Sequence, residues 1–579
     1  MTASGKIRKS LPLLCTAALV LYAFAGVSEG ADLSDTTYSL GNYENFMTLQ
    51  GDWQYATYLS NLIGFIVFRL TGGRLLYFNM ITRLIPAACA VCVLHGLKKH
   101  IPFPVLFLGE LFALGLCWCP TAILYNYLSY TAFSLSAVLL LSAGEGKEKK
   151  KKYLLAGILL GVAFLARISN LLYCILILYV IYADMLDGKK EELPADILSC
   201  IIGYVCGVAA SLLLLLVSRM AAGEGLRTSA EGIGDAIAWA AGLLGGENGE
   251  ASGGYSLGDM LKLVIDAYIF AAKRALFMIA GLAAGTVMFM IKKDSFLKLK
   301  KILYICGIAL LFIYYFKRGV FTRSYYNNGS IYGVCGIFIL IMLVIFCFSL
   351  FHKGISKSDK KLACMGLLIL LVSPLGTNNH FYAVINQMFV TAPLCVFLAI
   401  RLIRRYKGAA CAFPLAAMLL AFFALLLFQS VMFHFCFAFG DGEDGVARVY
   451  RIESEGRLKG MKTNWKRGNA IDALTEAAKD CGGRLVTYGN LPGLYYVLDK
   501  EPALSTLWPD LDSFSYEDMK SDIDRLSADG SDVMFIIKAD MADEADGKYR
   551  LIKEFIDENA YVKGYNEDDY IMYLPGGVR

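Results

Sequence analysis

Long apolar runs separated by short basic connectors make up the first three quarters of the chain. The runs lie at residues 11–27, 75–97, 101–119, 121–141, 197–217, 275–291, 302–316, 331–351, 362–375, 383–400 and 411–433. As α-helices, most of them are long enough to span about 30 Å of hydrocarbon. The pattern predicts a polytopic α-helical membrane protein.

A further apolar stretch, from Tyr153 to Ala183, is too long for one ordinary crossing and is interrupted by Arg167. Lysines before it (147–152) and after it (189–190) should both face the cytoplasm. An even number of crossings is then required, so we predict a hairpin of two short helices.

With this hairpin, every basic connector falls on one side of the membrane, including those around Lys98, Lys300, Lys357 and Arg404. The positive-inside rule then predicts about thirteen transmembrane helices, an N-terminus in the cytoplasm and a C-terminus outside the cell membrane. A cleaved signal peptide is an alternative interpretation of the first run, and it leaves the remaining topology unchanged.

The outer side carries a long loop, residues 28–74, before the second crossing, and we place another outer loop, rich in glycine, at residues 219–273. Two amphipathic runs in it, one starting at Asp35 and one from Trp53 to Leu70, predict helices that lie on the membrane surface. The first outer loop therefore belongs to a transmembrane domain that we place at residues 1–435.

The tail, residues 436–579, alternates helix-like and strand-like runs. The runs RLVTYG from Arg484 and VMFIIK from Val533 are short and apolar, and we predict that they form adjacent buried strands. The pattern indicates a small C-terminal extracytoplasmic α/β domain.

Composition agrees with a bilayer as the solvent, since 57% of the residues are hydrophobic. The tail from residue 441 holds roughly 18 basic and 28 acidic residues, so the net charge of +5 conceals a basic membrane part. No phosphate-binding or dinucleotide glycine loop occurs, and we expect no cofactor and no nucleic-acid partner. The five histidines are too dispersed for a histidine metal cluster.

Asp35 is the first candidate for chemistry, because it follows the first crossing and begins an amphipathic helix at the outer face. Tyr38 and Asn42 are spaced for the same side of that helix, and Asp32 lies three residues earlier. The plainer interpretation is that Asp35 only caps the helix.

Arg167 is the second candidate. It lies about 21 Å along a helix from the cytoplasmic lysines, hence in the outer leaflet, with Asn170 beside it. Burial of an arginine in lipid is costly, so its side chain either faces a polar cavity or extends to the outer surface.

Two outer segments add polar groups that can bind hydroxyls or phosphate. One is TNNHFY, with Asn378, Asn379, His380 and Tyr382, and its alternative role is helix capping with a solvated histidine. The other is a basic loop, for which contact with lipid headgroups is the alternative to anion binding. This loop contains Lys317, Arg318 and Arg323.

The layout resembles the glycosyltransferase C superfamily, typified by protein O-mannosyltransferases and the aminoarabinose transferases of lipid A. The resemblance rests on the first outer loop with its acidic DLSDTTYSLGNYENF, the surface helices, about thirteen crossings and the outer C-terminal domain. FLARISN and SPLGTNNHFYAVIN also look similar to segments of bacterial members.

The resemblance implies transfer of a sugar from a polyprenyl-phosphate carrier to an acceptor at the extracytoplasmic face. Asp35 would act as the catalytic base. Arg167, Asn170, the basic loop and the TNNHFY segment would bind the donor's phosphate and sugar, and Asp32, Tyr38 and Asn42 would orient the helix or the acceptor. The partners would be the lipid-linked donor, membrane lipids and an acceptor of unidentified class, whether glycan, lipid or protein.

The sequence departs from metal-dependent oligosaccharyltransferases, because the second outer loop around Pro120 is short and holds no paired acidic motif. Asp32 and Asp35 alone are a thin ligand set, so we expect no metal. A transporter or lipid flippase and a non-catalytic cell-envelope assembly protein remain alternatives. If the enzyme interpretation holds, Asp35, Arg167 and the His380 loop should meet at one cavity, with no ion pair between Asp35 and Arg167.

Overall fold

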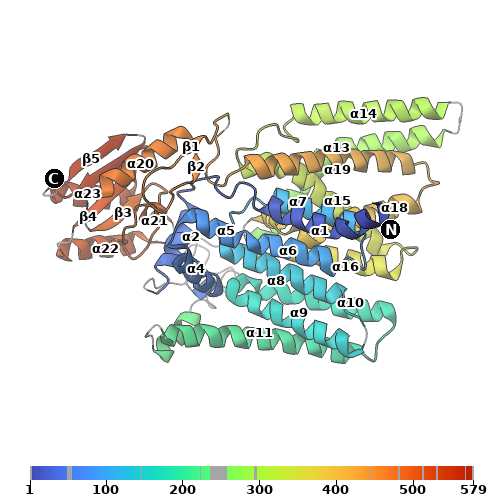
Figure 1. The fold of residues 1–579 in the computed structure, drawn as a ribbon, viewed down its shortest axis with the longest axis horizontal. Helices are drawn as coiled ribbons and strands as arrows, with labels where there is room; N and C mark the ends of the chain where they lie inside the picture. The colour runs from blue at the N-terminus through green and yellow to red at the C-terminus, as the bar shows by residue number, and fades with distance from the viewer. Residues whose placement is uncertain are drawn as a thin grey trace.

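The computed structural model describes residues 3–576 except for 48–54, 145, 222, 224, 235–256, 292–295, 378, 444, 480, 482, 512–513, 530–531 and 568. Most of it is a bundle of long helices, and a small sheet lies at one end of the bundle (Figure 1). The C-terminus lies at the sheet end, and the N-terminus at the other.

The bundle contains α1 (Ala3–Ala23), α5 (Leu75–Thr82), α6 (Leu84–Gly96), α7 (Phe103–Leu116), α8 (Leu124–Leu141), α9 (Gly146–Ala166), η1 (Ile168–Ile177), α10 (Leu178–Asp187), α11 (Leu193–Ala221), α13 (Leu257–Met290), α14 (Leu297–Lys317), α15 (Tyr332–Phe351), α16 (Lys357–Val372), α17 (His380–Asn386), α18 (Met388–Arg405) and α19 (Ala412–Cys436), with the short η3 (Asn328–Ile331) before α15.

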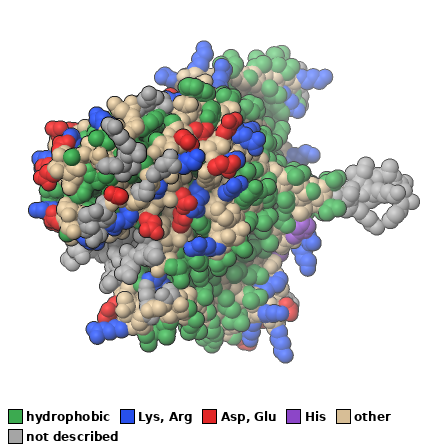
Figure 2. Space-filling model, turned by 60° about the vertical axis from the view of Figure 1, so that its left-hand side comes forward, with side chains coloured by type: hydrophobic (Ala, Val, Ile, Leu, Met, Phe, Trp, Pro, Cys, Tyr) green, Lys and Arg blue, Asp and Glu red, His purple; other side chains and the backbone are tan. Residues whose placement is uncertain are grey.

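Among the described residues, 7 helical segments are long and apolar enough to cross a membrane, or 8 if the bent pair α17–α18 is one span. Three shorter apolar helices accompany them. Figure 2 shows charged side chains gathered on the sheet end, with a broad hydrophobic region beside it. These features indicate a multi-pass membrane protein, and the number thirteen stays a prediction.

The long apolar stretch around Arg167 divides as the hairpin prediction requires. Helix α9 ends at Ala166, Arg167 has an extended backbone (φ −160°, ψ 126°), and η1 begins at Ile168. Lys149 near the start of α9 contacts Asp184 near the end of α10, so the two segments run antiparallel.

Close backbone packing holds α11 against α9. Gly157 and Gly161 of α9 face Gly203 and Gly207 of α11, and a Cβ on Gly157 would lie 2.1 Å from the carbonyl oxygen of Cys200. Only glycine permits this approach, because a Cβ atom would collide with the facing backbone. The two helices are therefore in direct van der Waals contact through their backbones.

The segment after α11 differs from the expected outer loop, which was placed at residues 219–273. Helix α13 already begins at Leu257 and has 34 residues, so much of the expected loop is helix. The first turns of α13 are amphipathic and contain Asp259 and Lys262. Because these charges interrupt the apolar run, the hydrophobic pattern alone did not indicate a helix there. The glycine-rich part at 245–254 lies outside the described residues.

The first outer loop forms two helices, α2 (Asp35–Glu44) and α4 (Tyr58–Thr71), where amphipathic runs were predicted. They pack closely, with the Tyr43 ring lying over Gly64. The loop thus forms a compact platform between the bundle and the C-terminal sheet (Figure 1).

The C-terminal region contains a sheet of four strands in the order β3-β4-β6-β5. The predicted neighbours β3 (Arg484–Tyr488) and β4 (Val533–Lys538) are parallel and nearly fully buried. The other elements are β1 (Tyr450–Arg451), β2 (Lys462–Thr463), α20 (Trp465–Lys479), α21 (Leu494–Val497), α22 (Tyr516–Asp529), η4 (Ala539–Met541), α23 (Gly547–Glu558), β5 (Val562–Glu567) and β6 (Tyr570–Leu574).

The C-terminal region contacts the first outer loop through hydrogen bonds and an ion pair. The amide of Gly493 donates to the carbonyl of Leu33 at 3.0 Å. The hydroxyl of Tyr496 donates to the carbonyl of Gly73 at 2.6 Å, and Arg457 forms an ion pair with Glu44. Both ends of the loop are therefore held by the C-terminal region.

Candidate functional site at the sheet end of the bundle

The first turn of α2 gives Asp32 and Asp35 different roles. The Asp32 carboxylate accepts hydrogen bonds from the amides of Ser34 (3.0 Å) and Thr36 (2.7 Å), and from the Ser34 hydroxyl. It therefore satisfies the amides at the start of α2. The interpretation of Asp35 as the cap is wrong, because Asp35 is the first residue inside the helix and Asp32 supplies the capping bonds.

The Asp35 carboxylate is left available by this arrangement. Its side chain is exposed, and it makes no hydrogen bond or ion pair with any described residue. Protein atoms packed around the Asp35 carboxyl displace part of its water, and this raises its pKa to about 6. The negative charge of Asp32 is the second cause of the raised pKa. A carboxylate with a raised pKa is a stronger proton acceptor than an ordinary surface aspartate.

Arg167 lies at the break between α9 and η1, half-buried. Its guanidinium lies over the ring of Tyr125 at 5.5 Å and donates one 3.5 Å hydrogen bond to the carbonyl of Gly376. No carboxylate among the described residues pairs with it. Such a cation retains hydrogen-bonding capacity for an anion.

Tyr125 connects the two candidates. Both Asp35 and Arg167 lie within electrostatic range of Tyr125 and of Cys119. No ion pair joins Asp35 to Arg167, as far as the structure describes the chain. The two charges are thus held near one tyrosine without neutralising each other.

A cavity, here called the Arg167 cavity, opens beside this arginine. Its lining is largely polar, because three helix breaks meet at it: the α9–η1 break, the α7–α8 turn and the loop before α17. The lining includes Trp118, Asn126, Ser129, Tyr130, Arg167, Ser169, Asn170, Tyr173, Ser373, Thr377, Asn379 and Asn386.

Asn170 is buried in this lining and is already engaged. Its side-chain amide donates to the Ser129 hydroxyl at 2.6 Å and to the carbonyl of Ala163 at 2.8 Å. The amide of Arg167 also donates to this carbonyl at 3.2 Å, so Asn170 and Arg167 share one acceptor at the end of α9. Asn170 therefore shapes the break that presents Arg167.

The TNNHFY segment contributes unequally to the site. Asn379 is exposed and lines the Arg167 cavity, whereas Asn378 lies outside the described residues. His380 has a left-handed backbone (φ 36°), and its Nδ1 lies 2.9 Å from the hydroxyl of Tyr332. Tyr382 packs its ring against both Tyr332 and His380. The histidine thus contacts an aromatic cluster next to the cavity rather than its lining.

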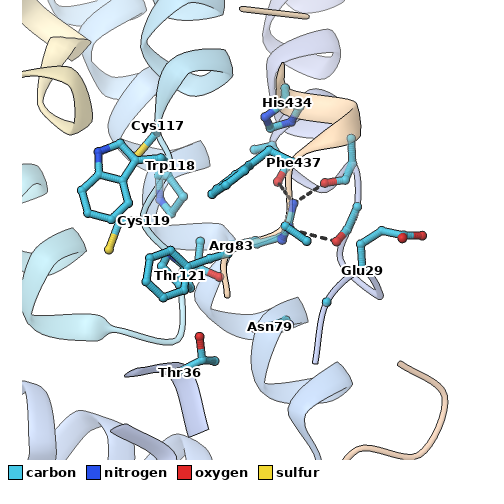
Figure 3. A pocket seen from close by; sticks show the side chains of 18 of the residues that line it. Glu29, Thr36, Asn79, Arg83, Cys117, Trp118, Cys119, Thr121, His434 and Phe437 are labelled. Carbon is cyan, nitrogen blue, oxygen red and sulfur yellow. Dashed lines mark hydrogen bonds between the residues drawn. The ribbon is translucent and has the colours of Figure 1, made fainter. Parts of the chain in front are cut away.

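Trp118 joins this segment to the α7–α8 turn. Its indole N–H donates to the carbonyl of Tyr382 at 3.2 Å, and its amide donates to the side chain of Asn386 at 3.0 Å. Trp118 also lines a second cavity, here called the Arg83 cavity, to which Asp32 and Thr36 contribute (Figure 3). One tryptophan therefore lines both cavities, whereas Asp35 is in the lining of neither.

Arg83 is a residue that the sequence analysis missed. Its guanidinium donates to the carbonyl oxygens of Ala23, Ala25 and Gly26, and so fixes the chain where it leaves α1 (Figure 3). His434 lines the same cavity from the end of α19. An arginine within the apolar run 75–97 was a usable signal, since such residues face a polar interior.

The basic loop does not reach these cavities. Lys317, Arg318 and Arg323 are exposed and line neither the Arg83 nor the Arg167 cavity. Arg318 donates to the hydroxyl of Tyr314, and Arg323 lies over the ring of Phe316. The two arginines of the loop therefore contact neighbouring aromatic side chains and not the lining of either cavity.

Tyr38 and Asn42 follow Asp35 along α2. Tyr38 lies in the range of the Asp35 charge and close to the side chain of Asn42, which is buried. The Tyr38 ring also meets Trp508 of the C-terminal region edge to face, with 5.2 Å between centroids. The C-terminal region thus contacts the catalytic candidate's helix one turn after Asp35.

The part of the chain that the structure describes holds no group of three or more histidine, cysteine, aspartate or glutamate residues able to bind a metal ion. Both carboxylate oxygens of Asp32 also accept hydrogen bonds from amides at the start of α2. The expectation that the site uses no metal stays a prediction.

No family model and no curated protein matches the chain, whereas solved structures do. The chain is similar to a crystal structure of the oligosaccharyltransferase of Archaeoglobus fulgidus in complex with zinc and sulfate. The TM-score is 0.46 at 12% sequence identity, and the alignment covers 97% of this chain and 73% of that chain. At this TM-score the similarity carries no argument about the site.

Proposed function

We propose that the protein is a membrane glycosyltransferase, which moves a sugar from a polyprenyl-phosphate carrier to an acceptor at the extracytoplasmic face. One observation supports it above the others. Asp35 has an unengaged carboxylate with a pKa raised to about 6, and it shares Tyr125 as a neighbour with Arg167, a cation that no described carboxylate neutralises.

The proposed step uses these two charges on opposite sides of the transferred sugar. Asp35 takes the proton of the acceptor hydroxyl as its oxygen attacks the anomeric carbon. The bond from that carbon to the phosphate oxygen breaks, and its electron pair leaves with polyprenyl phosphate. Arg167 stabilises the negative charge that develops on this leaving group.

Keeping the base and the cation apart is necessary for this chemistry. A direct ion pair would lower the basicity of Asp35 and would occupy the guanidinium. The aromatic ring of Tyr125 beside Arg167 holds the guanidinium by a cation–π contact instead, which leaves its N–H groups free for a ligand.

The lining of the Arg167 cavity suits a sugar phosphate. The exposed side chain of Asn379 and the nearby Ser169 offer donors and acceptors for hydroxyls, and Trp118 offers a ring edge and face. The roles proposed for Lys317, Arg318 and Arg323 are confined to contact with lipid headgroups, because their side chains lie away from this cavity.

The location follows from the same proposal. The donor is anchored in the bilayer by its polyprenyl chain, so the reacting carbon must lie close to the membrane surface. Helix α2, which begins with Asp35, lies at the sheet end of the bundle (Figure 1), and the positive-inside pattern assigns this end to the extracytoplasmic side. The C-terminal region then covers the site from outside the cell membrane.

The test is transfer from radiolabelled polyprenyl-phosphate sugars by the purified full chain in lipid vesicles, comparing Asp35→Asn with the unchanged protein. Loss of the base should lower the transfer rate roughly 100- to 10,000-fold. Donor binding should persist, because the amide keeps the shape and Asp32 keeps the helix cap. Asp524→Asn is the matched control, an exposed carboxylate of the C-terminal region. Near-normal transfer by Asp35→Asn refutes the proposed base.

A further inference from the structure

A hollow opens at the end of the bundle opposite the site described above. Helix α18 starts next to the His380 segment and has 18 residues, so its last turn lies about 27 Å away along the helix axis. The hollow is open to solvent. It is lined by Ser349, Ile355, Asp359, Leu398, Arg401, Leu402, Arg404 and Arg405.

The charges in this hollow do not balance. Three arginines of α18 meet one carboxylate, Asp359, which accepts hydrogen bonds from Arg401 through Nε (3.3 Å) and Nη2 (3.2 Å). Arg404 and Arg405 are exposed and form no ion pair or hydrogen bond with any described residue. Two guanidinium groups are therefore available to an anion, and each can donate two parallel hydrogen bonds to a phosphate.

A buried polar atom lies at the base of the hollow. Ser349 of α15 has 1% of its surface exposed, and its hydroxyl finds no hydrogen-bond partner in the structure. A serine in a helix ordinarily donates to the carbonyl one turn earlier, so a buried hydroxyl without that bond is costly. An oxygen atom of a bound ligand would satisfy it.

The surroundings of the hollow favour a ligand that comes from the bilayer. Its walls include Leu398 and Leu402, and the end of α15 leaves Phe351 with 73% of its surface exposed. Phe348 stacks on His352 beside it, and His352 also contacts the Tyr406 hydroxyl at 3.1 Å. Aromatic and amphipathic side chains of this kind mark the level where headgroups meet acyl chains.

We propose that this hollow binds the phosphate headgroup of an anionic lipid from the leaflet at that end of the bundle. Arg404 and Arg405 hold the phosphate, Ser349 donates to one of its oxygens, and Arg401 stays paired with Asp359. Basic pockets between the ends of transmembrane helices bind lipid headgroups in this manner. This site is independent of the proposed transfer reaction.

The experiment titrates the purified full chain in neutral detergent with dioleoyl phosphatidate, dioleoyl phosphatidylcholine or inorganic phosphate, and counts bound molecules by native mass spectrometry. Phosphatidate should bind the unchanged protein, and Arg404→Gln with Arg405→Gln should weaken this binding roughly 30-fold. Lys150→Gln with Lys151→Gln is the matched control, because it removes two exposed cations of the same end of the bundle.

Three outcomes would overturn the proposal. Equal weakening in the lysine control would indicate a diffuse surface charge, and equal binding of phosphatidylcholine would remove the need for an anionic headgroup. Displacement of phosphatidate by millimolar inorganic phosphate would assign the hollow to a soluble anion. If the double arginine variant does not fold, Ser349→Ala should still weaken binding severalfold, and unchanged binding by it would count against the built site.

Discussion

The two ends of helix α9 place a basic side chain in opposite surroundings. Near its start, the Lys149 ammonium is buried and lies 2.5 Å from carboxylate oxygens of both Asp184 and Asp196, with Glu192 at 3.4 Å. Just beyond its end, Arg167 is half-buried, and among the described residues its guanidinium makes one hydrogen bond to a carbonyl and lies over one tyrosine ring.

The difference separates a structural charge from one available to a ligand. The Lys149 cluster joins α9, α10 and the start of α11, and its buried cation and carboxylates lie within ion-pair distance and offset one another's charge. Arg167 lies next to a cavity, and Asp35, whose charge also acts on Tyr125, forms no ion pair with it among the described residues. A protein that tolerates an unpaired cation in this position gains a site for an anion.

The largest expected effect is on stability at the paired end. Lys149→Met leaves two buried carboxylates without their cation, and we expect the free energy of unfolding to fall by about 3–5 kcal/mol. Denaturant unfolding of the full chain in detergent measures this change. Lys150→Met, an exposed neighbour, should stay within about 0.5 kcal/mol of the unchanged protein. Equal effects of both substitutions would contradict the structural role of the cluster.

The unpaired end should show the reverse behaviour. Arg167→Gln removes the cation proposed to meet the leaving phosphate, so transfer should fall roughly 100- to 1,000-fold. The free energy of unfolding should change little, because no ion pair is lost. Arg167→Lys should recover part of the rate, since it restores the charge without the planar guanidinium. A loss of stability that matches the loss of transfer would make Arg167 a structural residue like Lys149.

The contrast between these ends also indicates what local sequence patterns can predict. The break at Arg167 was predictable, because lysines on both flanks of one long apolar run require an even number of crossings. The parallel neighbours β3 and β4 were predictable from their short apolar runs. Both inferences use information that lies within a few turns of the residue concerned.

The missed features depend on contacts between distant segments. Trp118 reaches Tyr382 and Asn386 across 264 and 268 positions, and no periodicity near Trp118 indicates this. The basic loop was selected by charge alone, yet Arg318 turns to the Tyr314 hydroxyl one helical turn earlier. The sequence places a side chain at a depth in the membrane, whereas the packing of helices decides which cavity it faces.

A smaller effect is expected in the pH dependence of transfer. A base must be ionised, so kcat/KM should fall as the pH decreases through about 6, the pKa of the Asp35 carboxyl. Because the charge of Asp32 contributes to the raised pKa, Asp32→Asn should move this acidic limb to lower pH. The limb is measured from initial rates between pH 4.5 and pH 8, about two units either side of the pKa. An unmoved limb would assign it to another group.

Ionisation of Asp35 should affect stability and transfer in opposite ways, because it supports transfer but lowers the free energy of unfolding. The pKa of Asp35 is raised in the folded state, so ionisation disfavours folding. This cost is fully present above about pH 6 and is relieved as the pH falls toward the ordinary value of 3.8. Asp35→Asn should therefore unfold at a slightly higher temperature than the unchanged protein at pH 7, while it loses transfer. A thermal unfolding scan at pH 7 and pH 5 checks both signs.

The smallest expected effect concerns how the C-terminal region maintains the unpaired end. Trp508 meets Tyr38 edge to face on the helix that carries Asp35, and such pairs stabilise an arrangement by about 0.5–1.5 kcal/mol. Trp508→Ala should lower transfer roughly 2- to 10-fold, because α2 loses a contact one turn from the base. It should also admit water near Asp35, which lowers the pKa of that carboxyl and moves the acidic limb to lower pH.

Trp465→Ala is the matched control for this last prediction. Trp465 belongs to the same C-terminal region and has 63% of its surface exposed, so its removal should change neither the rate nor the acidic limb. If both tryptophan variants lose transfer equally, the C-terminal region acts through its overall fold. A shift of the acidic limb in Trp508→Ala alone would show that burial by this region sets the basicity of Asp35. The ion cluster around Lys149 needs no such control of basicity.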